Sequence, residues 1–101
     1  MKTTTNSLLI RTNGTMEIVN PSNAKRGWTL DELYGHMGCE MIEVVQPNTK
    51  SNVIEGNWKN PIMICDEEGI LNGKQLNVLA SFLAGQHIVG DVVITESKNL
   101  R

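Results

Sequence analysis

Cysteine and long apolar runs are scarce in this sequence, and each scarcity excludes a class of protein. Two cysteines, Cys39 and Cys65, are too few for a disulfide scaffold, so both are expected to be free thiols in a reducing compartment. Apolar runs such as Val92-Val93-Ile94 are far shorter than the roughly 20 residues that cross a bilayer. The run from Leu8 to Ile10 is too short for a signal-peptide core. The sequence therefore predicts a cytoplasmic protein without a membrane partner.

A large excess of positive or negative charge is also lacking. The chain has 9 Lys and Arg against 11 Asp and Glu, which gives a formal net charge of -2 at pH 7. This balance produces no broad positive field, so general attachment to nucleic acid or to an anionic membrane is not expected. With 40% apolar and 20% charged residues the composition is that of a globular chain. Residues 1–101 are expected to form a single domain.

Recognisable catalytic motifs are absent as well. There is no glycine-rich phosphate loop and no serine nucleophile elbow. The four residues of zinc-binding type contain one local pair but not the paired spacings of a zinc site, and they are His36, Cys39, Cys65 and His87. Neither cysteine has a motif that indicates an activated nucleophile. We therefore expect no enzymatic activity, no metal and no cofactor.

The first part of the chain predicts a hairpin and a helix. Two strand-like runs, 7–12 and 15–19, flank Asn13-Gly14, the dipeptide that best tolerates two successive positive φ values. Thr29 and Glu32 have the spacing of a capping box, and apolar residues then recur with a helical period as far as Met37. Gly38 supplies the left-handed stop. A helix is therefore expected over residues 30–37.

The remainder of the chain predicts three more strands and a second helix. The strands are expected at 41–46, 61–66 and 90–95, and the helix at about 75–84. A long polar loop at 47–60 and a mobile tail at about 96–101 complete the chain. The order is strand-strand-helix-strand-strand-helix-strand. This order predicts an α+β fold, a small antiparallel sheet of about five strands with two amphipathic helices on one face.

Lys25, Arg26 and Trp28 form the first candidate binding segment. Two cations beside an aromatic ring, just ahead of a helix N-terminus, suit a phosphate with a stacked base. The alternative is a hydrophobic staple, in which Trp28 packs against Leu33 and fixes the entry to the helix. Lys25 and Arg26 can serve binding in either case.

Asn57, Trp58 and Lys59 form the second candidate segment, within the long polar loop. Trp58 has no periodic apolar stripe to join, and an exposed tryptophan among hydrogen-bonding residues is typical of a contact hot spot. The equally weighted alternative is a loop that folds back so that Trp58 caps one end of the core.

The opening hairpin and four further segments carry a resemblance to a known family. The four segments are Glu43-Val44-Val45, Ile64-Cys65-Asp66-Glu67-Glu68-Gly69, Asn77-x-x-Ala80 and Ile88-Val89-Gly90-Asp91-Val92-Val93. Together they resemble a family of small domains that is classified as a domain of unknown function and is encoded mainly by phages and mobile elements. The chain departs from that family in its 47–60 loop and in its two tryptophans.

The resemblance implies an accessory protein of a mobile element, and compact proteins of that origin often act by occupying a host component. We expect a non-catalytic protein, in the cytoplasm of a bacterial host, that inhibits a host defence factor by masking a protein surface or by sequestering a small nucleotide signal. The alternative is a small regulatory or nucleic-acid-binding module with phosphate contacts at Lys25, Arg26, Lys50 and Lys59. Unpaired sheet edges also predict a homo-oligomer.

Overall fold

The computed structural model of the chain describes residues 6–23, 25–48 and 58–100. Its strands are β1 (Ser7–Ile10), β2 (Met16–Val19), β3 (Ile42–Val45), β4 (Pro61–Asp66) and β5 (Val92–Glu96), and its helices are α1 (Leu30–Met37), α2 (Val78–Ala84) and the short 3-10 helix η1 (Ser97–Asn99). The strands lie in the order β2-β1-β5-β4-β3, and every neighbouring pair is antiparallel. The predicted α+β class, with five antiparallel strands and two α-helices, is confirmed.

The central strands are buried on both faces of the sheet. All five residues of β5 are buried, and so are residues 62–66 of β4. A strand with one solvated face would instead alternate between buried and exposed residues. Successive residues of β4 enter two separate clusters. Ile62 and Ile64 pack with Leu33 of α1 in what we call the α1-side core, and Met63 packs with Leu83 of α2 in the α2-side core.

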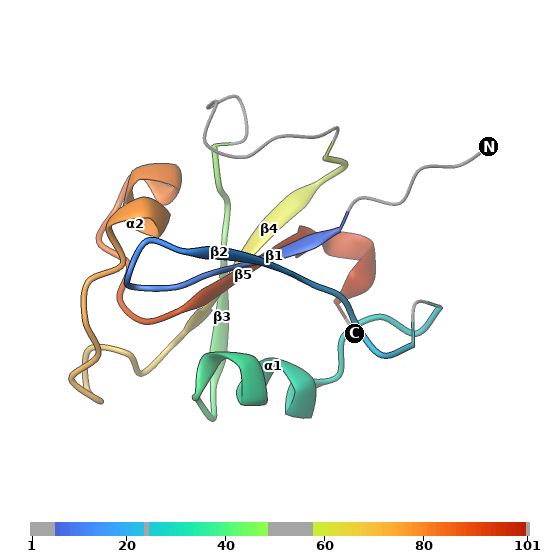
Figure 1. Cartoon of the computed structure of the whole chain (residues 1–101), viewed down its shortest axis with the longest axis horizontal. Helices are drawn as coiled ribbons and strands as arrows, with labels where there is room; N and C mark the ends of the chain where they lie inside the picture. Colours follow the sequence, from blue (N-terminus) through green and yellow to red (C-terminus); the bar gives the residue numbers. More distant parts are fainter. Residues whose placement is uncertain (1–5, 24, 49–57, 101) are drawn as a thin grey trace.

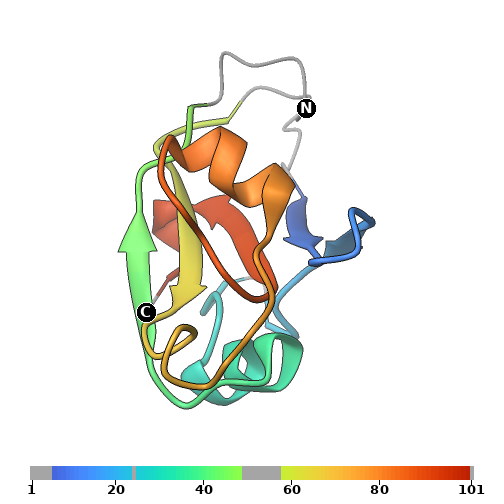
Figure 2. The same cartoon turned by 90° about the vertical axis from the view of Figure 1, so that its left-hand side faces the viewer.

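The prediction that both helices share one face is therefore wrong. In Figure 1 the strands run between α2 and α1, and the turned view in Figure 2 again places the two helices far apart. The physical reason lies in the apolar runs 62–65 and 92–94, which offer apolar side chains to both faces. One helix covers each face, and the sheet is the middle of three layers.

Helix α1 has the predicted bounds because its capping signals act as expected. The Glu32 amide donates to the Thr29 hydroxyl (3.2 Å), and the Thr29 amide donates to the Glu32 carboxylate (3.0 Å). Gly38 ends the helix at φ 62°, and its amide donates to the Tyr34 carbonyl (2.8 Å). Leu33 and Met37 supply the buried stripe.

Helix α2 begins three residues later than the predicted start. Residues 75–77 are instead bonded to the segment before β5: Leu76 forms an antiparallel bridge with Val89, and the Asn77 amide donates to the Ile88 carbonyl (2.8 Å). Asn77 is the N-cap, and its side chain accepts from the Ala80 amide (3.0 Å). The cross-segment bonds and the cap together override the apolar periodicity that runs back through Leu76.

The predicted hairpin at Asn13-Gly14 is confirmed by the antiparallel pairing of β1 with β2. In its turn Gly14 has a positive φ (89°) and donates to the Arg11 carbonyl, and the Asn13 side chain accepts hydrogen bonds from Thr15. The expected mobile tail is largely structured. Strand β5 includes Glu96, η1 follows it, and Leu100 pairs with Trp28 and packs on the α1-side core.

Candidate functional site

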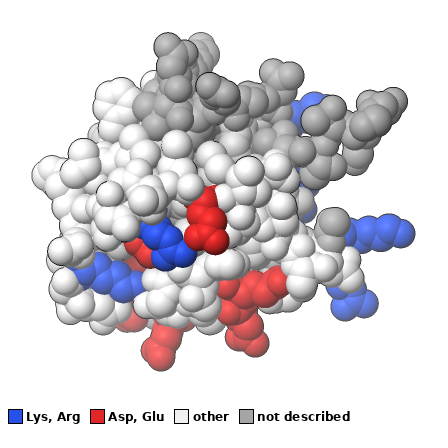
Figure 3. All heavy atoms as spheres, viewed as in Figure 1, with Lys and Arg blue, Asp and Glu red and all other residues white. Residues whose placement is uncertain are grey.

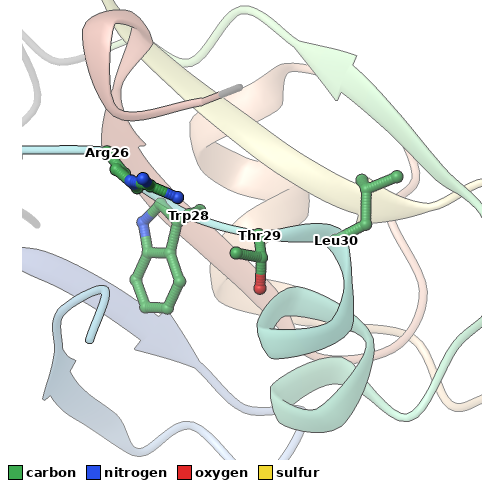
Figure 4. Close-up of a pocket in the computed structure, with 4 residues that line it drawn as sticks. All are labelled: Arg26, Trp28, Thr29 and Leu30. Carbon is green, nitrogen blue, oxygen red and sulfur yellow. The ribbon is translucent and has the colours of Figure 1, made fainter. Parts of the chain in front are cut away.

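The Lys25–Trp28 segment lies beside a surface hollow of about 440 Å³. Arg26, Trp28, Thr29 and Leu30 line this hollow (Figure 4). In Figure 4 the Trp28 ring and the Leu30 side chain point in opposite directions from the chain. Leu30 is 45% exposed, whereas Trp28 is only 1% exposed. The hollow therefore offers an apolar wall at Leu30 but no face of the indole.

Trp28 is a core residue. Its ring nitrogen donates to the Thr95 hydroxyl (3.3 Å), and its ring meets His36 edge to face with centroids 5.5 Å apart. It belongs to the α1-side core together with Leu33, its partner in the staple alternative. A buried indole cannot stack on a base, so the stacking role weighed for Trp28 does not fit this structure.

The N-terminus of α1 already holds an anionic group. The amides of Thr29 and Ser22 donate to the Glu32 carboxylate at 3.0 and 2.9 Å and lower its pKa from 4.5 to about 2. The carboxylate thus takes the place that a phosphate would occupy at the helix end. An incoming phosphate beside Lys25 and Arg26 would meet this negative charge.

The second predicted segment lies elsewhere on the molecule. Asn57 is outside the described residues. Trp58 is half-buried and packs against the α2-side core, so the two tryptophans belong to opposite faces of the sheet. Lys59 is exposed, and its amide donates to the Glu96 carboxylate (2.8 Å), which ties the end of the loop to the end of β5. The structure therefore does not bring the two predicted segments into one site.

Basic side chains do not gather into a patch on the face seen in Figure 3. Acidic side chains lie along its lower edge, near α1, and basic side chains project from separate places. Lys25 and Arg26 are exposed, but Glu32 holds the adjacent helix end. Lys50 lies outside the described residues. On this face, the basic side chains of the described residues do not form a continuous track for a nucleic-acid backbone.

The cysteines are buried and separated. Cys39 lies in the α1-side core and Cys65 in the α2-side core, and both are free thiols. Burial raises the pKa of both thiols, that of Cys65 to about 12, which disfavours the reactive thiolate. Across the described ranges, no group of three or more His, Cys, Asp or Glu residues is placed to hold a metal ion.

An apolar surface on the outer side of α2 was missed in the sequence. Val78 is 70% exposed and Phe82 is 65% exposed. They lie one helical turn apart and line a hollow of about 510 Å³ together with residues 81 and 85–87. His87 also lines a second hollow with Ile70, which is 79% exposed. We call Ile70, Val78, Phe82 and His87 the α2 face.

The signal for the α2 face was present in the composition of the helix. Every residue of α2 except Ser81 is apolar. Only Ala80 and Leu83 are fully buried, because a helix packed on a sheet hides one side and leaves the other to solvent. A helix that is apolar around its whole circumference therefore indicates a second contact, and tracing only the buried stripe conceals it.

Comparison with known proteins places the chain in a family. The family described as Domain of unknown function (DUF3846) matches residues 4–99, and the chain belongs to it. No curated protein and no solved structure matches the chain. Among the described residues, no helix has the length and apolar character needed to cross a membrane.

Proposed function

We propose that this DUF3846 chain is a non-catalytic accessory protein of a phage or mobile element, and that it inhibits a bacterial defence factor by masking a surface of that protein. It acts in the host cytoplasm. The observation that carries the proposal is the exposure of Val78 and Phe82, two large apolar side chains that project together from a short helix. Burying such a pair against a partner is favourable, and aromatic anchors in a hollow are typical of contact hot spots.

Masking has more support than sequestration of a nucleotide. A nucleotide site needs a ring to stack on the base and donors for the phosphate. The first candidate segment offers neither an exposed ring nor a helix-end amide, although Lys25 and Arg26 are exposed. Trp28 is buried, and the amides at the start of α1 are bonded to Glu32 and Thr29. The nucleic-acid alternative is weaker because Lys25 and Lys59 belong to segments at different places in the fold, one before α1 and one before β4.

The chemistry of the α2 face defines the partner that it fits. Helix α2 carries no charged residue, and the hollow beside it is lined by apolar and neutral polar side chains and by His87. A matching protein surface is therefore apolar at its centre with a polar rim. Glu43, Asp66 and Glu67 line the second hollow, at Ile70, whereas the hollow beside α2 has no Asp, Glu, Lys or Arg in its lining. We therefore expect binding centred on Val78 and Phe82 to depend little on salt concentration.

Phage plating tests this function directly. Bacterial strains, each with a single defence system, would produce the chain and be challenged with a phage that the system restricts. We expect the wild-type chain to restore plating on one such strain and Phe82→Ser to lose the effect. Val44→Ser removes a comparably exposed apolar side chain (48%) from β3 and should remain active. Unrestored plating on every strain, or full activity of Phe82→Ser, would contradict the proposal.

A further inference from the structure

Strand β2 is a free edge of the sheet, and the phase of its hydrogen bonds decides which residues face outward. The Arg11 amide donates to the Thr15 carbonyl (2.9 Å) at the closed end of the hairpin. From that bond the antiparallel ladder alternates, so Glu17 turns its backbone N–H and C=O toward β1. Met16 and Ile18 turn theirs away from the sheet, where another strand can bond to them.

The side chains of the same two residues are apolar and exposed. Met16 is 46% exposed and Ile18 is 62% exposed. In the β1–β2 register they lie opposite Ile10 and Leu8, which belong to the α2-side core, so they extend that face of the sheet beyond the area that is covered. Among the residues that the structure describes, the edge therefore offers unpaired backbone and apolar surface at the same positions.

The usual protections of an edge strand are missing from β2. The strand contains no lysine and no proline, and its single charged residue is Glu17. The Glu17 carboxylate lies 2.8 Å from the guanidinium of Arg11, the residue that follows β1, and this ion pair balances its charge. An approaching strand therefore meets no uncompensated charge on β2.

The strand that best fits this edge is β2 of a second copy. A two-fold antiparallel pairing centred on Ile18 places that residue against its own copy, with Glu17 opposite Val19 and Met16 opposite Asn20. Met16 and Ile18 of both copies then form one apolar stripe. Centring the pairing on Glu17 would instead place two carboxylates directly opposite each other, which is destabilising.

We propose that the chain forms a two-fold dimer through antiparallel β2–β2 pairing centred on Ile18, which joins the two five-stranded sheets. The inference is independent of the proposed function, since it concerns β2 and not the α2 face. It can be tested on the purified chain alone, so a monomer would reject the dimer without bearing on host-protein masking.

Sedimentation velocity at micromolar concentrations tests the edge. We expect a dimer for the wild-type chain and a monomer for Ile18→Lys, with circular dichroism confirming that the variant is folded. Val44→Lys places the same charge at a similarly exposed position on the other edge strand, β3, and should remain dimeric. A monomeric wild-type chain, or a dimer that Val44→Lys dissociates and Ile18→Lys does not, would overturn the proposal.

Disulfide trapping tests the register. Residues directly opposite in an antiparallel pair have Cα atoms about 5.5 Å apart, which a disulfide can span. Mild oxidation should therefore link Ile18→Cys chains in the dimer. Met16→Cys is the matched control, because the two copies of that position would lie about 13 Å apart along the strands. Cys39 and Cys65 are buried and should not contribute. Failure of Ile18→Cys to link, or equal linking of Met16→Cys, would contradict the pairing.

Discussion

At the scale of single residues, Asn77 does more than cap a helix. Its side chain is fully buried and has a partner for each polar group: the amide nitrogen donates to the carbonyls of Ile10 (3.0 Å) and Gly90 (2.9 Å), and the oxygen accepts from Ala80. One carboxamide thus joins the end of β1, the segment before β5 and the start of α2. Only the capping role has a recognisable sequence spacing.

Replacing Asn77 should destabilise the fold strongly. Asn77→Ala leaves buried backbone groups at Ile10, Gly90 and Ala80 without their partner, so we expect a loss of about 2–4 kcal/mol in the free energy of unfolding. Asn77→Asp keeps the cap but turns a carboxylate toward two carbonyls, and it should be comparably harmful. Urea unfolding measures both, with Asn72→Ala in an exposed turn as the control. A loss below about 1 kcal/mol in both variants would show that the network matters little.

Glu32 should make the free energy of unfolding depend on pH. Its pKa is lowered from 4.5 to about 2, because the amides of Thr29 and Ser22 donate to the ionised carboxylate. A depressed pKa in the folded state adds stability above pH 4.5 that is lost as the pH falls toward 2. The stability difference between wild type and Glu32→Gln should therefore be present at neutral pH and disappear over that range. A difference that stays constant down to pH 2 would contradict this account.

At the scale of elements, the sequence predicts those whose signals are local. Helix α1 has its predicted bounds because its capping residues, Thr29, Glu32 and Gly38, lie within one short segment and their capping hydrogen bonds form within that segment. The start of α2 is not predicted. Leu76 fits the apolar period of the helix, but its backbone forms an antiparallel bridge with Val89, a residue distant in the sequence. The structure of the C-terminal residues is not predicted either, since the bridge between Leu100 and Trp28 joins distant parts of the chain.

Gly27 shows how such a long-range junction constrains one position. It has φ 81°, and a Cβ atom there would lie 2.3 Å from the Asn99 carbonyl oxygen, next to the bond that Trp28 donates to the same oxygen (2.6 Å). Gly27→Ala should therefore loosen η1 from the α1 entry and lower the melting temperature. Gly38→Ala is a useful comparison, since it shares a positive φ but meets no atom within 4 Å. Equal losses for the two variants would indicate that backbone strain alone is responsible.

Trp58 should act mainly through stability. It is half-buried against the α2-side core at the end of the long loop, so Trp58→Ala removes packing contacts. We expect a loss of about 2 kcal/mol, which for a domain of this size lowers the melting temperature by about 10 °C. A melting temperature unchanged by the substitution, together with impaired plating activity, would return Trp58 to the role of a contact residue.

At the scale of the whole molecule, the arrangement of the helices and the candidate site were the hardest features to predict. The continuous apolar runs in β4 and β5 are consistent with burial on both faces of the sheet, but they do not reveal which face each helix covers. The same limit applies to the site. Local patterns single out Trp28 beside two cations and Trp58 in a polar loop, but packing buries Trp28 and leaves Phe82 exposed. Which residues can form a binding surface depends on which side chains the packing of the fold leaves exposed.

The most direct test of host-protein masking is to measure binding and folding together at Phe82. A photoreactive phenylalanine analogue at this position would identify the host protein, and calorimetry would then compare the purified wild-type chain with Phe82→Ser. We expect the variant to bind at least about 30-fold more weakly, equivalent to about 2 kcal/mol, with an unchanged melting temperature because the side chain is 65% exposed. Equal affinity of the two chains for the identified protein would contradict the account.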